Sequence, residues 1–272
     1  KLTSTGSPAT ITQSGLFTKK GMTYHFSGYF RTDSPELRIK VVLKALLPDE
    51  SWMILASADI PKQRSEWRMF SCDLISTGTT DNAVFEISIS GNGSLWMDKL
   101  SLMPDDNVNG WRSDVVEAIR ELAPPVIRWG GCVIDPGHYK WKDCVGNRDY
   151  RVPFENWFWG RIDSNDVGID EFLQFCEAVQ AEPLVCISFA DGAQNAADLV
   201  HYCNGLSRST EWGKKRVENG HPEPYNVKYW QIGNELDDSH YIDGFIAIAK
   251  AIKSADHDAV IFASFPSEEL LR

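Results

Sequence analysis

The chain has 272 residues, of which 43% are hydrophobic, so it can bury one large core or two smaller ones, which argues against wholesale disorder. Its formal charge of -11 argues against nucleic acid or an anionic membrane as a partner and suits a neutral polymer. No apolar run of about 18 residues could span a membrane, and the six cysteines form no C-x-x-C pair, so we expect neither a metal ion nor another cofactor.

The first part of the chain, residues 1–103, predicts an all-β domain. Short runs in which apolar and polar side chains alternate are separated by turns that contain Gly, Asp or Asn, which indicates a β-sandwich of the jelly-roll kind. The predicted strands cover Thr23–Thr32, Leu37–Leu46, Trp52–Ala58, Trp67–Leu74, Ala83–Ser90 and Leu95–Met103. Trp52, Trp67 and Trp96 fit core positions, so the interpretation we favour is a purely structural sandwich.

Residues 104–272 instead alternate helical and strand patterns, which predicts a parallel sheet. The predicted helices cover Ser113–Leu122, with Ser113 as the N-cap, Gly168–Val179, Asn195–Asn204 and Ile242–Ala255; the predicted strands cover Val126–Trp129, Pro183–Ser188, Val227–Ile232 and Val260–Ser264. A closed (β/α)8 TIM barrel has eight strands. We therefore expect part of a barrel, whose open edges associate with the remaining segments of the same polypeptide or with another copy.

Asn234 and Glu235 form the most informative pair, because they follow the predicted strand Val227–Ile232 at the end where barrels carry out chemistry. A carboxylic acid held there beside apolar side chains can have a raised pKa and donate a proton at neutral pH. Glycoside hydrolysis commonly requires such an acid and a second carboxyl group. The alternative is a helix N-terminus, with Asn234 as the cap and Glu235 in the first turn.

Arg128 is a second candidate, because it ends the strand Val126–Trp129 and is followed by Gly130 and Gly131. A guanidinium group can hold a carboxylate with two hydrogen bonds and keep it ionised, as a carboxylate nucleophile requires. The alternative is an ion pair with a structural carboxylate.

The long segment that contains His138–Trp141 and Trp157–Trp159 is rich in aromatic residues. A loop of this length and composition between β-α elements indicates a functional site. The alternative is a loop that packs its aromatic rings into a small core of its own.

Five segments in order over residues 105 to 265 resemble glycoside hydrolase family 51, the α-L-arabinofuranosidase family of clan A. They are Ile127–Cys132, Tyr139–Asp143, Asp163–Phe172, Val200–Gly205 and Lys228–Glu235. The segment Leu95–Pro104 more loosely resembles the end of a carbohydrate-binding-module-like sandwich found in related members.

The resemblance implies a retaining glycosidase in which Glu235 is the general acid/base and Asn234 binds the 2-hydroxyl of the sugar. Arg128 would lie under the nucleophile and orient it, while Cys132 and Trp159 would line the furanose pocket. The nucleophile of the family lies on a later strand, beyond residue 272, so activity is expected to require segments absent from this chain. The segment Ile187–Gly192 departs from the family pattern, which leaves the sugar specificity open.

The substrate implied by the resemblance is an arabinose-containing polysaccharide of the plant cell wall, acted on by a secreted or periplasmic enzyme. One alternative is an endo-β-1,4-glucanase or xylanase of the same family, with β-glucan as a substrate. Another is a non-catalytic carbohydrate-binding protein, which predicts exposed aromatic residues on a face of the sandwich.

Overall fold

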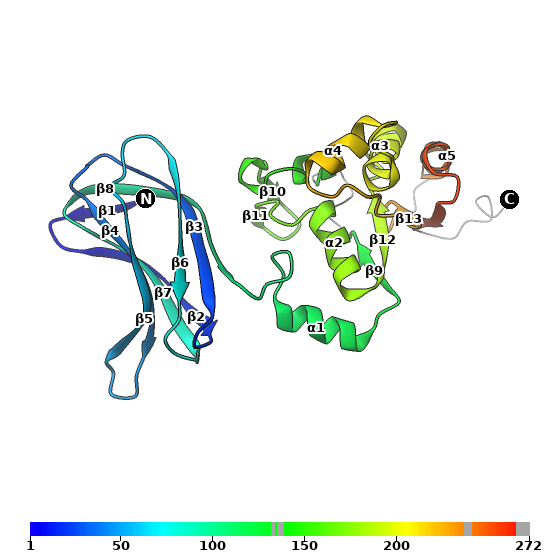
Figure 1. Ribbon diagram of the computed structural model, residues 1–272. Helices are drawn as coiled ribbons and strands as arrows, with labels where there is room; N and C mark the ends of the chain where they lie inside the picture. Colours follow the sequence, from blue (N-terminus) through cyan, green and yellow to red (C-terminus); the bar gives the residue numbers. More distant parts are fainter. Residues whose placement is uncertain (132–133, 135–138, 237–240, 265–272) are drawn as a thin grey trace. The chain divides into compact units, whose positions relative to one another are not determined.

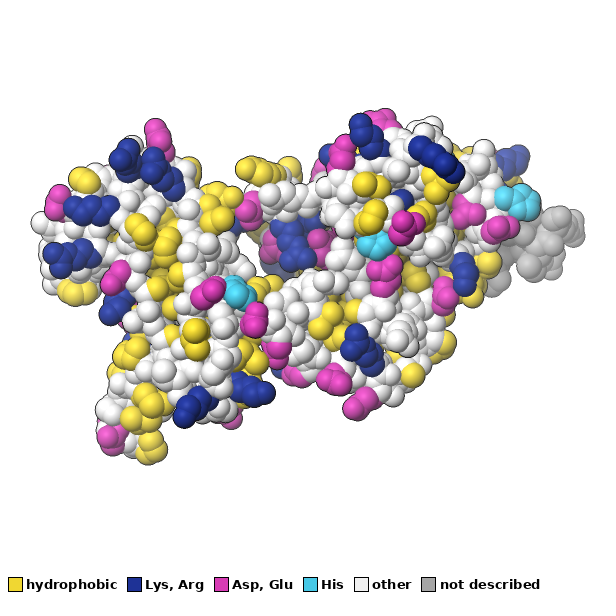
Figure 2. Space-filling model, in the orientation of Figure 1, with side chains coloured by type: hydrophobic (Ala, Val, Ile, Leu, Met, Phe, Trp, Pro, Cys, Tyr) yellow, Lys and Arg dark blue, Asp and Glu magenta, His cyan; other side chains and the backbone are white. Residues whose placement is uncertain are grey.

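The computed structural model describes residues 1–131, 134, 139–236 and 241–264. It divides into two compact units, Lys1–Gly110 and Trp111–Arg272 (Figure 1). Lys and Arg side chains are interspersed with Asp and Glu on the face shown in Figure 2. Among the described residues, no helix is long and apolar enough to cross a membrane.

The first unit is a sandwich of two four-stranded antiparallel sheets, with strand orders β1-β8-β3-β6 and β2-β7-β4-β5. The strands are β1 (Leu2–Thr5), β2 (Ala9–Thr18), β3 (Thr23–Thr32), β4 (Arg38–Leu46), β5 (Trp52–Ile60), β6 (Arg68–Ile75), β7 (Thr80–Ser90) and β8 (Asn92–Pro104). The chain changes sheet at most connections, as in a jelly roll. All six predicted strands are confirmed, whereas β1 and β2 are not predicted by the sequence. Most side chains of β2 are exposed, so this strand lacks the apolar alternation of a half-buried strand.

The core of the sandwich follows the two-residue alternation. Phe26 and Phe30 of β3 and Val41 and Leu43 of β4 are buried, while the residues between Phe26 and Phe30 on the other face of β3 are less buried. The predicted core positions of Trp52 and Trp67 are wrong, because 47% and 46% of these residues are exposed.

The second unit is built on a parallel sheet of order β14-β13-β12-β9, flanked by helices. Its strands are β9 (Val126–Trp129), β12 (Glu182–Ile187), β13 (Tyr229–Ile232) and β14 (Val260–Ala263), and its helices are α1 (Ser113–Leu122), α2 (Ile169–Val179), α3 (Gly192–Asn204), α4 (Glu211–Glu218) and α5 (Tyr241–Ala255). The four predicted strands are confirmed, and their consecutive parallel order fits part of a (β/α) barrel. The predicted cap is wrong: Arg112 occupies the N-cap position of α1, and Ser113 is the first helical residue.

The connection between β9 and α2 is not predicted in detail by the sequence. It contains two short 3-10 helices, Trp141–Cys144 and Arg148–Tyr150, and a hairpin of β10 (Phe154–Asn156) and β11 (Arg161–Asp163). Helix α4 is also missed, because its sequence is polar and includes Gly213.

The core of the second unit packs the helices against the sheet. Val185, Ile187, Trp230 and Ile232 from the strands are fully or almost fully buried. Cys176 and Cys186 are buried free thiols, as the sequence predicts. Burial raises the pKa of the Cys176 thiol to about 12, so it stays protonated at neutral pH.

Candidate active site

Arg128 joins the carboxyl ends of two strands that are not direct neighbours. Its Nε donates to Oε1 of Gln231 at 2.8 Å, and its Nη2 donates to Oδ1 of Asn234 at 2.7 Å. In the sheet register Arg128 lies opposite Leu184, which in turn lies opposite Tyr229. Gln231 is two residues beyond Tyr229, so its side chain points to the same face of the sheet. The long guanidinium side chain therefore spans β12 and connects β9 to the segment after β13.

Close packing fixes the turn after β9. Gly130 has φ +154°, and a Cβ atom at this position would overlap the Cβ of Cys186 on β12. A larger residue would need both an unfavourable backbone conformation and a shift of β12. The glycine thus lets β9 and β12 approach each other closely beside Arg128.

The turn after β13 is held from both sides. The N–H of Gly233 donates to the carbonyl of Ile187 at 2.9 Å, and its carbonyl accepts from Nε2 of Gln231 at 2.9 Å and from the thiol of Cys186 at 3.2 Å. Gly233 itself has φ +72°, which glycine adopts readily. These bonds fix the backbone that carries Asn234 and Glu235.

The alternative in which Asn234 caps a helix is wrong, because Glu235, which would lie in the first turn, has φ +56° and is not helical. Asn234 instead accepts the hydrogen bond from Arg128. Glu235 is exposed and has φ +56°, a left-handed conformation that is uncommon for a residue other than glycine. Such strained residues cluster at functional sites, where the surrounding structure holds them in place.

Among the described residues Arg128 forms no ion pair with a structural carboxylate, and its predicted place under the nucleophile stays a prediction. The two acceptors of its hydrogen bonds, on Gln231 and Asn234, are neutral amide oxygens rather than carboxylates. A structural ion pair therefore does not account for these two hydrogen bonds, and the guanidinium group positions the Asn234 side chain.

Tyr241 and Ser264 support the carboxyl ends of β13 and β14. The hydroxyl of Tyr241 donates to the carbonyl of Ile232 at 2.7 Å and accepts from the N–H of Ser264 at 2.9 Å. The hydroxyl of Ser264 donates to the same carbonyl at 2.9 Å. These two residues and Gln231 are not predicted from the sequence; the only signal for Gln231 is an amide within an otherwise apolar strand.

The aromatic segment divides into a buried part and an exposed part. Trp141 is buried and packs against Trp212 and Tyr202, with ring centroids 4.7 Å and 5.6 Å away. Trp157, Phe158 and Trp159 lie at the tip of the β10–β11 hairpin and are largely exposed.

The small self-packed core is therefore the wrong interpretation for the hairpin. Trp159 is 65% exposed, its ring contacts Phe158 edge-on at 5.4 Å, and its backbone N–H donates to Oδ1 of Asn156 at 3.1 Å. It also lines a surface depression of about 440 Å³ with Arg161 and Ile162. The contacts of Trp159 lie within its own hairpin, and its predicted place in a sugar pocket stays a prediction.

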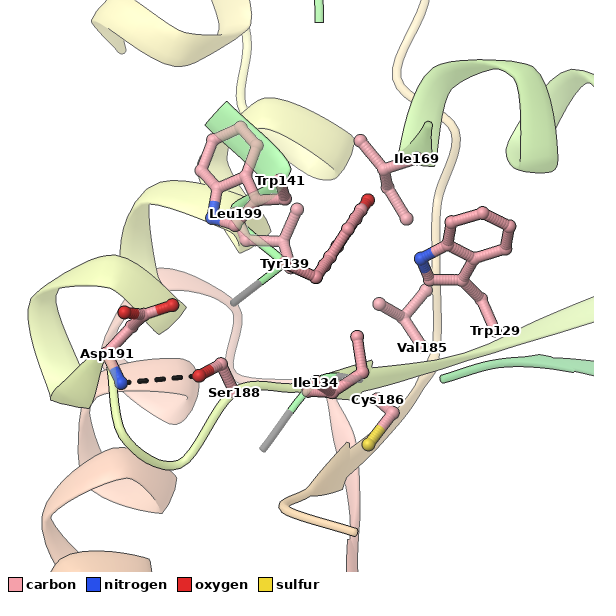
Figure 3. Close-up of a pocket in the computed structure, with 10 residues that line it drawn as sticks. All are labelled: Trp129, Ile134, Tyr139, Trp141, Ile169, Val185, Cys186, Ser188, Asp191 and Leu199. Atoms are coloured by element: carbon pink, nitrogen blue, oxygen red, sulfur yellow. Dashed lines mark hydrogen bonds between the residues drawn. The ribbon is translucent and has the colours of Figure 1, made fainter. Parts of the chain in front are cut away.

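A small cavity lies between β9, β12 and the aromatic segment (Figure 3). Its volume is about 10 Å³, room for about one water molecule. Trp129 Nε1 and the Tyr139 hydroxyl on its lining are buried without a hydrogen-bond partner among the described residues. Burial raises the pKa of Tyr139 well above its ordinary value, so its hydroxyl stays protonated. This cavity is part of the core, and a sugar does not fit in it.

One further prediction depends on a residue that the structure does not describe. Cys132, a predicted pocket residue, lies outside the described residues. Within the described part of the chain, no group of three or more His, Cys, Asp or Glu side chains could hold a metal ion.

The parallel α/β sheet thus brings a glutamate, an asparagine and the arginine that holds the asparagine to the carboxyl ends of its strands, the arrangement of a (β/α)-barrel site. Comparison with known proteins gives the family. The model of the α-L-arabinofuranosidase 1 domain matches residues 118–270, more than half of the chain. The chain belongs to the α-L-arabinofuranosidase family, glycoside hydrolase family 51.

Two relatives illustrate the likeness in sequence. α-L-Arabinofuranosidase C of Emericella nidulans is 43% identical over 134 residues, which cover 49% of this chain and 26% of that protein. The extracellular exo-α-L-arabinofuranosidase of Streptomyces chartreusis is 27% identical over 303 residues, which cover 96% of this chain and 36% of that protein. The chain thus spans about a quarter to a third of the length of these relatives.

Solved structures agree with the fold. An arabinose-bound family 51 α-L-arabinofuranosidase matches 95% of this chain and 46% of its own, with a TM-score of 0.78 and 21% identity, which shows a shared fold. The arabinose complex of the α-L-arabinofuranosidase of Thermotoga maritima is 32% identical, with a TM-score of 0.54 over 58% of this chain and 34% of its own. A β-sandwich followed by part of a barrel is consistent with the first match, which covers nearly all of this chain.

Proposed function

We propose that the complete protein is a retaining glycosidase that releases α-L-arabinofuranosyl residues from plant cell-wall polysaccharide. The observation that carries the proposal is the hydrogen bond from Arg128 to Asn234, which fixes the side chain next to Glu235 at the carboxyl end of the sheet. The relatives described above are named α-L-arabinofuranosidases, so neither a glucanase or xylanase nor a non-catalytic binding protein is favoured. The name of the Streptomyces chartreusis relative supports secretion of the complete protein.

In the proposed reaction Glu235 first protonates the glycosidic oxygen as the bond to the leaving group breaks. A second carboxylate, on a segment that completes the barrel, attacks the anomeric carbon and forms a covalent glycosyl-enzyme. Glu235, now ionised, removes a proton from the water that hydrolyses this intermediate. One residue thus serves as acid and then as base, which requires an exposed carboxyl group within reach of solvent.

Asn234 and Arg128 have supporting roles in this proposal. Asn234 binds the 2-hydroxyl of the sugar, and Arg128 holds the Asn234 amide in one orientation through Nη2. Because Nε of Arg128 is bonded to Gln231, we assign the remaining Nη1 to the second carboxylate. An arabinose-bearing polymer is the proposed substrate, and Trp159 and Cys132 are proposed to line the pocket for its terminal sugar.

The test is Glu235→Gln in the complete enzyme, compared on aryl arabinofuranosides with good and poor leaving groups. Loss of the acid should lower turnover by about 10²- to 10⁴-fold on poor leaving groups, whereas a dinitrophenyl leaving group needs no protonation in the first step. Sugar binding should remain largely intact.

Glu182→Gln is the matched control, because it removes the same charge at the amino end of β12, where Glu182 pairs with Lys228. This variant should keep its turnover on all substrates. Equal turnover of Glu235→Gln and wild type on poor leaving groups would refute the acid role.

A further inference from the structure

Gln231 lies at the centre of the hydrogen bonds that hold the turn after β13. Its Oε1 accepts from Nε of Arg128 at 2.8 Å, and its Nε2 donates to the carbonyl of Gly233 at 2.9 Å. Arg128 in turn donates from Nη2 to Oδ1 of Asn234 at 2.7 Å. Because Gly233 and Asn234 are consecutive in the chain, these three hydrogen bonds and the backbone between them close a ring. Gln231 thus joins the guanidinium group of β9 to the turn that carries Asn234 and Glu235.

The ring of hydrogen bonds fixes the direction of the Gln231 amide. An amide side chain has a donor end and an acceptor end, whereas a guanidinium group only donates and a carbonyl only accepts. The opposite orientation of the amide would point N–H groups at each other beside Arg128 and oxygens at each other beside Gly233. Only one orientation therefore satisfies both partners, so the backbone of the turn determines how Gln231 holds Arg128.

The side chains beside Gln231 in the sheet cannot replace its amide. In the register of the strands Gln231 lies between Cys186 of β12 and Phe262 of β14. The thiol of Cys186 donates to the Gly233 carbonyl at 3.2 Å, and a thiol sulfur is only a weak acceptor. The ring of Phe262 has no polar atom. Without the Gln231 amide, neither neighbour would offer Nε of Arg128 a strong acceptor, and the guanidinium group would lose one of its two anchors.

A neutral amide also holds Arg128 without compensating its positive charge. A carboxylate at position 231 would form an ion pair with the guanidinium group through charged hydrogen bonds. The amides of Gln231 and Asn234 instead fix its direction and leave its charge available. This property fits the proposed role of Arg128 beside a second carboxylate, because a nearby positive charge favours the ionised form of a carboxyl group.

We propose that Gln231 is a positioning residue that acts through Arg128 on Asn234 and thereby sets the selectivity of the enzyme for sugars that carry a 2-hydroxyl. The inference rests on the proposed function, in which Asn234 binds that hydroxyl. A site built to bind a hydroxyl rejects an analogue that lacks it, because a polar group of the site is then left unpaired. Once Gln231 is removed, the Asn234 amide must be ordered at the moment the sugar binds, which weakens this discrimination.

The test compares nitrophenyl α-L-arabinofuranoside with its 2-deoxy analogue as substrates of the complete enzyme. Gln231→Met keeps the length of the side chain and removes the amide. This variant should lower kcat/KM on the arabinofuranoside by about tenfold or more and on the 2-deoxy analogue by less than about twofold. The ratio of the two kcat/KM values should therefore fall, whereas a purely structural loss would lower both values by the same factor.

Both rates come from the same sample, so their ratio does not depend on the fraction of the variant that is folded. Gln231→Asn is a second variant, which stays polar but is too short to reach both Arg128 and Gly233, and it should lower the ratio as well. Gln194→Met is the matched control: it removes an amide that donates to Asp198 within α3 at 2.9 Å, and it should keep the ratio within about twofold of wild type. In an Asn234→Ala background, Gln231→Met should change the ratio by less than about twofold.

Three results would overturn the proposal: an unchanged ratio in both Gln231 variants, an equal fall of the ratio in Gln194→Met, or an undiminished effect of Gln231→Met in the Asn234→Ala background. The failure of this proposal is separable from that of the proposed function. If wild type hydrolyses the arabinofuranoside in preference to its 2-deoxy analogue and the Gln231 variants keep that preference, only the positioning role is refuted. If wild type does not hydrolyse the arabinofuranoside, the proposed function itself is refuted, and the role of Gln231 with it.

Discussion

Glu171 attaches the aromatic segment to helix α2 through a buried ion pair. Its carboxylate accepts from Nη2 of Arg151 at 2.7 Å, from Nη1 at 2.9 Å and from the N–H of Gly168 at 2.8 Å. The side chains of Arg151 and Glu171 are only 2% and 7% exposed. Arg151 also donates to the carbonyls of Gly146 and Asn165, so one pair fixes both ends of the segment that carries the β10–β11 hairpin.

Glu171→Gln should therefore be strongly destabilising. Removing one charge from a buried pair leaves the other uncompensated and costs about 3–5 kcal/mol; we expect the lower end, about 3 kcal/mol, because the amide oxygen of Gln can still accept one hydrogen bond. Urea unfolding followed by tryptophan fluorescence measures the change. Glu182→Gln, from a pair in which both side chains are about half exposed, should cost less than about 1 kcal/mol.

The pH dependence provides a second readout of the same pair. Burial raises the pKa of Glu171, but the hydrogen bonds from Arg151 and Gly168 outweigh it, so the pKa in the folded protein lies below its ordinary value of 4.5. The stabilisation is thus present above pH 4.5 and is lost as the pH falls through the lowered pKa of the folded state. Wild type should lose stability over this acidic range more steeply than Glu171→Gln. If Glu171→Gln costs no more than Glu182→Gln, the reasoning is refuted.

Two further predictions concern Asp170, the residue before Glu171, and the glycine turn after β9. The carboxylate of Asp170 accepts from the hydroxyl of Tyr225 at 2.5 Å, and burial raises its pKa, so its contribution to stability is lost as the pH rises through the raised pKa of the folded state. Asp170→Asn should change the free energy of unfolding at pH 7 by less than about 1 kcal/mol. A fall in melting temperature as large as that of Glu171→Gln would contradict this. Gly130→Ala should lower the free energy of unfolding by about 3 kcal/mol, because the new Cβ combines backbone strain with overlap of Cys186. Gly131→Ala, which has open space around its Cβ, should lower it by about 1–2 kcal/mol from strain alone. Equal shifts in melting temperature would contradict the role of the contact between β9 and β12.

The regular elements could be predicted from the sequence because their apolar residues recur with a clear period. The strands Thr23–Thr32 and Val126–Trp129 begin and end at the predicted residues, and the helix Ser113–Leu122 ends at the predicted residue. The β10–β11 hairpin could not be predicted, because its tip is apolar but exposed and gives no alternation. The assignments of residues 1–103 to a carbohydrate-binding-module-like sandwich and of residues 104–272 to a catalytic portion stay predictions.

The candidate site was predictable in part for a topological reason. Arg128 and Asn234 each follow or end a parallel strand, and parallel strands bring their carboxyl ends to one edge of a sheet, so these residues had to lie near each other. Which atoms would meet was not predictable, because an arginine can reach several acceptors along that edge. The register of β9, β12 and β13 brings the amides of Gln231 and Asn234 to Arg128, which the sequence did not predict, and the carboxylate that the sequence suggested as its partner stays a prediction.

The sequence does not show on which face of a β-sheet a tryptophan side chain lies. A side chain in a strand lies on one of two faces, and a change of register by one residue exchanges them. The pairing of β4 with β5 shifts between Leu43 and Lys44, so alternation counted along β5 gives no reliable face for Trp52. For Trp67 the neighbours decide: Phe30 and Thr32 occupy the core, so Arg31 points outward, and the rings of Trp67 and Trp96 lie beside it. An aromatic residue can thus be assigned to the outer face of a sheet only through the burial of residues on the adjacent strand.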